Sequence, residues 1–286
     1  MACIASATSR IRVGSGGVLL GHYQPLKVAE QFNLLEAMFP GRIDLGLGSS
    51  TGSPPRVALA LRAGASAVPF EERLDALLEY LGPGEPGAFR AVPVVSPPPL
   101  PWILGTSPTS ARLAAARGLP FAVGQFLAPR NMDETIDTYH AAFVPSKWLE
   151  RPYVNLALFV LCAESEERAF ALGSSAEAWL VQSSLRKMNV PFPTTSAALA
   201  ATYDASEQLE LASRRNAVFV GTGEQVALRL RGLVTDGRVQ ELTLVTITEN
   251  FDDRLRSYRF VAEACGLSPA SASLSFSTRA SRGPRS

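Results

Sequence analysis

Short apolar segments rich in β-branched residues alternate with helical segments along most of this 286-residue sequence. The expected strands lie near residues 11, 42, 102, 120, 154 and 241. Between them, apolar residues recur at helical spacing, as in the run Val28, Phe32, Leu35 and Phe39. This alternation predicts right-handed βα units and a parallel sheet. Periodicity alone leaves two α/β architectures open, a doubly wound sheet and a barrel.

The length suits one large α/β domain or two small ones, with enough chain to bury a substantial core. We expect a domain over residues 1–267, because periodic apolar patterns continue to Leu267. Residues 268–286 are Ser-rich, contain three Arg and lack a periodic pattern, so a disordered tail is expected there.

Charge and composition exclude several classes of partner. The 27 basic and 26 acidic residues leave a net charge of +1, which gives no whole-chain attraction to nucleic acid or anionic membranes. No apolar run is long enough to cross a bilayer, and the amino terminus lacks the features of a secretory signal. Three scattered Cys fit reduced thiols, and two His cannot build a His-rich metal site. A cytoplasmic protein without a metal is therefore expected.

The turn at Leu104–Ser110 is the clearest candidate site. A strand ends at Gly105, Ser107 is a preferred N-cap, and Pro108 suits the first helical position. The exposed amides of such a helix start bind anions well, and the carboxyl side of a parallel strand is where α/β active sites lie. Two interpretations stay open here, an ordinary capped helix and a phosphate site.

Other glycine-rich turns carry weaker signals. The run Gly46–Gly52 follows a strand, but its third glycine comes one residue too late for a dinucleotide-binding fingerprint. The run Gly14–Gly17 either relieves strain in a turn or lets a flat ligand approach the main chain. His22 follows it and is a candidate acid, base or donor, although a loop His is more often structural. No catalytic triad or carboxylate pair is recognisable.

Three long blocks together resemble the bacterial-luciferase-like, flavin-dependent monooxygenases. They read IRVGSGGVLLGHYQPLKVAEQFNLLEAMFPGRIDLGLG, PWILGTSPTSARLAAARGLPFAVGQFLAP, and VGTGEQVALRLRGL with ELTLVTITENFDDRLRSYRFVAEACGL. The match runs from about residue 4 to residue 267, and all three blocks agree with the family in order, spacing and residue type.

The resemblance implies a TIM-type (β/α)8 barrel that binds reduced FMN at the carboxyl ends of its strands. A flavin reductase would supply the FMN, and O2 would oxygenate an organic small molecule. The resemblance also implies a homodimer. Gly16 and Gly17 match a non-prolyl cis peptide beneath the flavin ring. The remaining matches are Thr106, Ser107 and Ser110 at the FMN phosphate, and Gln125 and Phe126 near the isoalloxazine and substrate.

This sequence departs from the family pattern in two places. Met1 falls where the second barrel helix belongs, so we expect about six of the eight strands, without the family's active-site His. Ser49 stands where the family has a phosphate-binding Arg, so the charge-assisted hydrogen bonds of that Arg are lost unless Arg56 or Arg62 substitutes. The departures motivate an alternative function, a non-catalytic flavin-binding or scaffold homologue. A deazaflavin-dependent hydride transferase is a third hypothesis.

Overall fold

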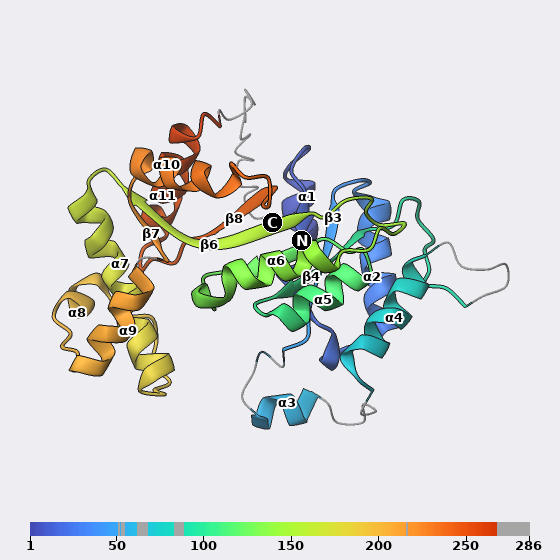
Figure 1. Ribbon diagram of the computed structural model, residues 1–286, viewed down its shortest axis with the longest axis horizontal. Helices are drawn as coiled ribbons and strands as arrows, with labels where there is room; N and C mark the ends of the chain where they lie inside the picture. Colours follow the sequence, from blue (N-terminus) through green and yellow to red (C-terminus); the bar gives the residue numbers. More distant parts are fainter. Residues whose placement is uncertain (51, 53–54, 62–67, 83–88, 216, 268–286) are drawn as a thin grey trace, which may run out of the picture. The chain divides into compact units, whose positions relative to one another are not determined.

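The computed structural model describes residues 1–50, 52, 55–61, 68–82, 89–215 and 217–267 (Figure 1). Its contacts define two compact units. Unit 1 comprises residues 1–160, 202–219 and 230–245, and unit 2 comprises residues 161–201, 220–229 and the residues from 246 onward. The tail expected over residues 268–286 lies outside the described residues, so the domain boundary at residue 267 stays a prediction.

The described residues form one sheet of eight strand segments. These are β1 (Val13–Gly14), β2 (Val18–Leu19), β3 (Ile43–Gly48), β4 (Leu100–Gly105), β5 (Phe121–Gly124), β6 (Val154–Ala163), β7 (Phe219–Thr222) and β8 (Glu241–Val245). The strand order is β1-β3-β4-β5-β6-β7, with β2 also paired to β3 and β8 to β6. The pairs of β3 with β1, β2 and β4, and those of β6 with β5 and β8, are parallel, as is β4 with β5.

The six expected strands are confirmed, and the parallel sheet is an incomplete TIM-type barrel. Within the described residues, no pairing between β8 and β1 closes the sheet. Two details differ from expectation. The first strand is divided into β1 and β2, and β7 lies where the sequence shows only a short apolar run at 217–220. Four apolar residues are too few to distinguish a strand from a buried turn.

Helices follow most strands, as the alternation predicts. They are α1 (Ala2–Ser6), α2 (Pro25–Met38), α3 (Pro55–Leu61), α4 (Phe70–Leu81), α5 (Pro108–Ala116), α6 (Met132–Ala142), α7 (Glu166–Leu180), α8 (Thr195–Leu199), α9 (Ala205–Arg215), α10 (Gly223–Val234) and α11 (Phe251–Ala264). Short turns of other helix types are η1 (Leu20–His22), η2 (Pro129–Asn131) and η3 (Val181–Leu185). Pro25 begins α2 at its first turn, and a Thr222–Gln225 capping box begins α10.

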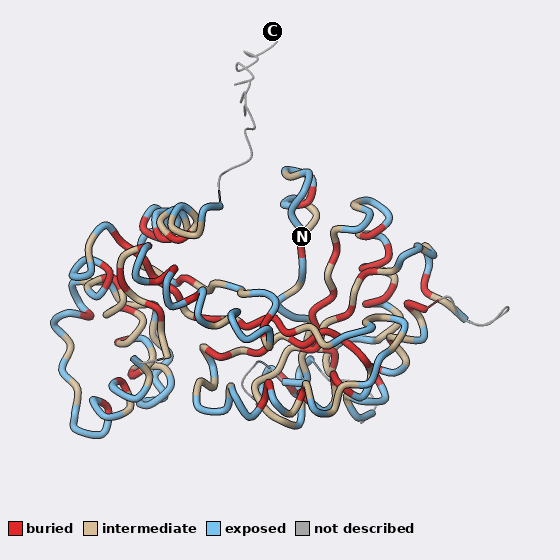
Figure 2. The backbone as a smooth tube through the Cα atoms, turned by 45° about the horizontal axis from the view of Figure 1, so that its top comes forward, coloured by how far each residue is buried: buried red, intermediate tan, exposed pale blue. Residues whose placement is uncertain are grey.

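The sheet of unit 1 has two chemically different faces. The helix face carries a row of fully buried side chains in register, Leu47, Ile103, Phe121 and Val154. Helices α2, α5 and α6 contact β3, β4 and β5. The opposite, open face is lined by Asp44, Gly46, Gly48, Trp102, Leu104, Ala122, Gly124, Ala157 and Thr243. Most of these residues are only half-buried or exposed, and Figure 2 shows how burial varies along the backbone.

Among the described residues, every helix falls short of the length and apolar character that a membrane crossing requires.

Candidate functional site

A bulge divides the first strand directly after Gly14. Val13 and Gly14 pair with Ile43 and Asp44, whereas Val18 and Leu19 pair with Leu47 and Gly48, so three residues face two across the ladder. The Ser15 hydroxyl bridges the gap by donating to the Gly46 carbonyl at 2.9 Å and accepting from the Gly46 amide at 3.0 Å. This side chain therefore replaces the lost ladder bonds of a buried glycine.

Close backbone approach explains the glycines at this bulge. A Cβ at Gly46 would lie 2.0 Å from the Ser15 carbonyl oxygen, and one at Gly17 would lie 2.9 Å from the Gly46 carbonyl oxygen. Gly16 is different, because a Cβ there would meet nothing within 4 Å. The exposed main chain at Gly16 is thus open to a flat ligand.

The expected cis peptide between Gly16 and Gly17 is wrong. In the described residues the cis bonds precede Pro93 and Pro97, and the Gly16–Gly17 bond is trans. The bulge accommodates the extra residue of the first strand. The Ser15 hydroxyl bonds to the carbonyl and amide of Gly46 on the neighbouring strand.

The predicted capped helix forms at the end of β4. Ser107 is the N-cap of α5, and its hydroxyl and that of Ser110 form a reciprocal capping box. The bond from the Ser110 amide to the Ser107 hydroxyl is long, at 3.4 Å, so that amide is weakly engaged. Thr109 is exposed at the same helix start.

Glycines bring this helix start close to the strand ends. A Cβ at Gly105 would lie 2.1 Å from the Ser110 hydroxyl oxygen, so only glycine lets α5 approach β4 this closely. The methyl group of Thr106 lies 3.2 Å from the Cβ position of Gly124. The three hydroxyl residues Thr106, Ser107 and Ser110 therefore gather at the carboxyl ends of β4 and β5.

Of the residues expected around the flavin phosphate and ring, Ser49 and His22 follow the carboxyl ends of β3 and β2. Ser49 is exposed directly after β3, and Arg56 is exposed on α3, whereas Arg62 lies outside the described residues. His22 ends η1, half-buried, directly after β2. The buried Arg73 of α4 donates to the carbonyl of the next residue, Tyr23, at 3.3 Å, which fixes this turn to the helix layer.

Gln125 and Phe126 follow β5, and the structure separates them from each other. The Gln125 side chain donates to the Ala217 carbonyl at 2.7 Å and lines a cavity with Leu158, a helix-face residue. The half-buried Phe126 donates its amide to the carbonyl of Ala157, which belongs to the open face. Gln125 is therefore directed away from the glycine-lined face.

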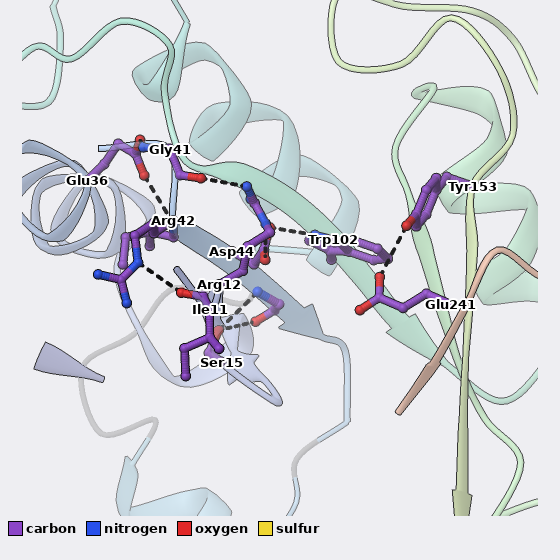
Figure 3. Close-up of polar contacts among 12 residues, drawn as sticks. Ile11, Arg12, Ser15, Glu36, Gly41, Arg42, Asp44, Trp102, Tyr153 and Glu241 are labelled. Carbon is purple, nitrogen blue, oxygen red and sulfur yellow. Dashed lines mark hydrogen bonds and ion pairs between the residues drawn. The ribbon is translucent and has the colours of Figure 1, made fainter. Parts of the chain in front are cut away.

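A polar network that sequence reasoning missed crosses the opposite end of the open face (Figure 3). Asp44 accepts two bonds from Arg12, at 2.9 and 2.6 Å, and one from the Trp102 indole at 3.0 Å. The Trp102 ring meets the Tyr153 ring edge-on at 5.6 Å, and the Tyr153 hydroxyl donates to Glu241 at 3.4 Å. Side chains alternate between the two faces of a strand, and this alternation places Asp44 and Trp102 on one face. The sequence pattern could therefore have indicated that these two residues lie close together.

Charge and burial shift the pKa values of two groups in this network. The hydrogen bond from Asp44 raises the pKa of the Arg12 guanidinium, which keeps it charged. Burial, followed by the negative charge of Glu241, raises the pKa of the Tyr153 phenol. Tyr153 is therefore a neutral hydrogen-bond donor at ordinary pH.

Comparisons with known proteins agree with this geometry. The family described as luciferase-like monooxygenase matches residues 1–240. The uncharacterized protein YwcH of Bacillus subtilis (strain 168) is 40% identical over 271 residues, which are 91% of this chain and 80% of the relative. The N-acetyl-S-alkylcysteine monooxygenase of the same organism is 31% identical over 271 residues, with the same two coverages.

A solved structure is also similar to this chain. The crystal structure of apo-MsnO8 matches with a TM-score of 0.82 at 34% identity, covering 94% of this chain and 82% of that one. The sequence and fold comparisons thus agree with each other. The chain is an oxidoreductase that belongs to the luciferase-like monooxygenase family.

Proposed function

We propose that this protein is an FMN-dependent monooxygenase that oxygenates an organic small molecule with O2, using FMN reduced by a separate flavin reductase. The observation that carries the proposal is the meeting of the open glycine face with the start of α5 at one edge of the sheet. Reduced FMN, when bound, supplies the electrons for O2 activation. The residues of this chain bind and orient it.

The start of α5 is the proposed phosphate site. The amide of the exposed residue Thr109 and the weakly engaged amide of Ser110 are the proposed donors, aided by the hydroxyls of Thr106 and Ser107. A phosphate oxygen is a stronger acceptor for the Ser110 amide than a hydroxyl at 3.4 Å. Positive charge at a helix amino end favours the dianion.

The proposed ring site lies along the main chain of Gly16 and Gly17, because Gly16 has no neighbour within 4 Å of its Cβ position. Ser49 offers the phosphate a hydroxyl in place of a guanidinium, and Arg56 is the proposed source of positive charge. His22 is the proposed acid or base, since it follows the same strand. Of the two residues after β5, we propose Phe126 for the substrate side.

Two further proposals concern assembly and location. The chain is proposed to act as a homodimer, because its uncovered strand edges favour pairing with a second chain. We place the protein in the cytoplasm, because it carries three free thiols and depends on a reductase for its flavin.

The proposal is tested in two steps with the full chain. Titration with FMN is expected to quench flavin fluorescence with saturation, and the deazaflavin F420 in a parallel titration is expected to bind at least about tenfold more weakly. A reductase-coupled assay with a panel of thioethers, ketones and long-chain aldehydes is then expected to show O2 uptake that depends on one of them.

Each negative result has a defined meaning. Absence of flavin binding at high micromolar protein would remove the proposal entirely. Tight FMN binding without O2 uptake on any member of the panel would favour the scaffold alternative. Preferential F420 binding would favour hydride transfer by a deazaflavin.

A further inference from the structure

Two oxidisable aromatic rings meet on the open face of unit 1. The indole of Trp102, on β4, and the phenol of Tyr153, just before β6, lie edge-on with their centroids 5.6 Å apart (Figure 3). Both residues are half-buried. Among the ring contacts of the described residues, this is the one that joins a Trp to a Tyr. Indole and phenol are the aromatic side chains that most readily give up one electron.

A carboxylate accepts the polar hydrogen of each ring. The Trp102 Nε1 donates to Asp44 at 3.0 Å, and the Tyr153 hydroxyl donates to Glu241 at 3.4 Å. Loss of one electron leaves a positive charge on an indole, which the negative charge of Asp44 stabilises. Arg12 shares this carboxylate, so the stabilisation is partial. An oxidised phenol releases its proton, and the carboxylate of the exposed Glu241 is in place to accept it.

The neighbouring Tyr139 is hydrogen-bonded differently. Its hydroxyl accepts from the Tyr153 amide at 3.2 Å and donates to the Leu119 carbonyl at 2.8 Å. A carbonyl oxygen does not take up a proton near neutral pH, so oxidation of the fully buried Tyr139 would leave its proton without a base. An oxidising equivalent that reaches Tyr153 therefore stays there.

The strand order gives these two rings a direction. Trp102 pairs with Gly46 across β3 and β4, and the Gly46 carbonyl oxygen lies 2.9 Å from the Cβ position of Gly17, in the proposed ring site. Neighbouring strands are about 4.8 Å apart, so Trp102 is one strand from this contact. Tyr153 directly precedes β6, which is three strands from β3 in the order of the sheet. Trp102 is thus the nearer ring, and Tyr153 is the more distant one.

We propose that Trp102 and Tyr153 form an electron relay, which carries oxidising equivalents from the flavin site to the surface at Glu241. Its role is protective, and that role rests on the proposed function. An oxygen-centred radical, formed by unproductive reduction of O2, takes one electron from Trp102 and becomes an anion. Tyr153 then gives one electron to Trp102 and its phenolic proton to Glu241, which leaves a neutral tyrosyl radical.

The relay runs in this direction and is reset by a soluble reductant. A phenol that loses its proton together with the electron is easier to oxidise at neutral pH than an indole, so the electron moves from Tyr153 to Trp102. A thiol or ascorbate then supplies the electron and the proton that restore Tyr153, and Glu241 releases its proton to water.

Pulse radiolysis with azide tests the relay in the full chain without flavin. The azide radical takes one electron from an indole and becomes azide, and the tryptophyl and tyrosyl radicals have separate absorption bands. We expect the tyrosyl signal to grow as the tryptophyl signal decays. The rate constant of this phase is expected to be independent of protein concentration, because the transfer takes place within one chain.

Variants identify the two rings. Trp102→Phe and Tyr153→Phe are each expected to abolish the concentration-independent phase. The controls Trp179→Phe and Tyr80→Phe are expected to keep it, because each of these two rings contacts a Phe ring. Glu241→Gln, which keeps the ring contact and removes the proton acceptor, is expected to slow the phase about tenfold.

The relay is overturned if wild type shows no concentration-independent phase, or if folded Tyr153→Phe or Trp102→Phe retains it at the wild-type rate. An unchanged rate in Glu241→Gln would overturn the proton transfer. Circular dichroism checks the fold, and the exposed Glu241 position decides the matter should Trp102→Phe not fold.

A second measurement tests the protective role. During incubation with reduced FMN and O2 but without an organic substrate, Tyr153→Phe is expected to accumulate oxidised side chains faster than Tyr80→Phe, as measured by peptide mass spectrometry. Equal damage in the two variants would overturn this role. The radiolysis uses no flavin, so absence of FMN binding would remove the proposed function and leave the result on electron transfer unchanged.

Discussion

At the residue scale, two Asp–Arg pairs of similar geometry differ in their surroundings. Asp44 accepts from Arg12 at 2.9 and 2.6 Å, and Asp75 accepts from Arg117 at 2.6 and 2.9 Å. The Asp44 side chain is only 18% exposed and also accepts from Trp102, whereas the Asp75 side chain is 58% exposed. Solvent therefore screens the Asp75 carboxylate more than the Asp44 carboxylate, whereas the two arginines have the reverse order, with Arg12 50% and Arg117 20% exposed.

We therefore expect Asp44→Asn to lower the free energy of unfolding by about 2 kcal/mol, because three donors lose a charged acceptor. The matched control Asp75→Asn is expected to cost less than about 1 kcal/mol. Urea unfolding of both variants measures the difference. Equal losses would show that the open-face network adds nothing to an ordinary surface pair.

The buried phenol of Tyr139 makes the free energy of unfolding decrease at high pH. The phenol is fully buried, donates to the Leu119 carbonyl at 2.8 Å and accepts from the Tyr153 amide at 3.2 Å. Burial raises the pKa of Tyr139 to about 12 from an ordinary 10. The folded state thus holds this proton more tightly, so its stabilising contribution is complete below pH 10 and is lost as pH rises towards 12.

The difference in unfolding free energy between wild type and Tyr139→Phe is expected to shrink by about 2 kcal/mol between pH 9.5 and 11.5. Burial also raises the pKa of the Cys162 thiol to about 12, but that contribution is common to both proteins and cancels. Urea unfolding across the pH range measures the difference. A constant difference would show that Tyr139 titrates normally.

At the element scale, two similar helix caps belong to different units of the chain. Ser107 caps α5, and Ser165 caps α7 in unit 2 by accepting from the Arg168 amide at 3.2 Å. Replacement of either serine by alanine is expected to cost about 1 kcal/mol of stability. Only Ser107→Ala is expected to raise the FMN dissociation constant, by about fivefold, because it loosens the phosphate turn.

Thermal unfolding and FMN fluorescence quenching measure the two effects side by side. Equal FMN affinity in both variants would remove α5 from the binding site.

The bulge between β1 and β2 depends on one hydroxyl. Ser15→Ala leaves the amide and carbonyl of the buried Gly46 without their partner, so we expect a loss of about 2 kcal/mol. Ser50→Ala is the control, because within the described part of the chain the Ser50 hydroxyl accepts one exposed amide, that of Gly52. Chemical denaturation that gives the two variants equal stability would contradict the bridging role.

The elements that sequence predicts well are those with local signals. The Ser-Pro start of α5, the Pro25 start of α2 and the Thr222–Gln225 box each follow from capping chemistry within four residues. The bulge is not predictable in this way, because Ser15 acts on Gly46, a residue 31 positions away. The same holds for Gln125, whose side-chain partner Ala217 lies 92 positions along the chain.

At the scale of the whole molecule, the sheet has strand edges that no described strand covers. Segments β1 and β2 pair with β3 alone, and β8 pairs with β6 alone. Uncovered edges favour pairing with a second chain. We expect light scattering after gel filtration to give twice the 30.5 kDa of one chain.

A substitution that adds a charge beside β1 tests whether the dimer forms by pairing of strand edges. Ile11 is 52% exposed and comes just before β1, so Ile11→Lys is expected to weaken dimerisation about tenfold. Leu209→Lys, at a 74% exposed position on α9, is the control and is expected to have no effect. A monomeric wild type, or equal effects of both changes, would argue against edge pairing.

The clamped indole of Trp102 has a practical consequence. Its Nε1 donates to Asp44, and its ring packs edge-on against Tyr153. It shares a sheet face with the glycines beside the proposed ring site, and a nearby flavin accepts excitation energy from tryptophan. We therefore expect quenching of Trp102 fluorescence to report the rates of flavin binding and release in a stopped-flow instrument, without any added dye.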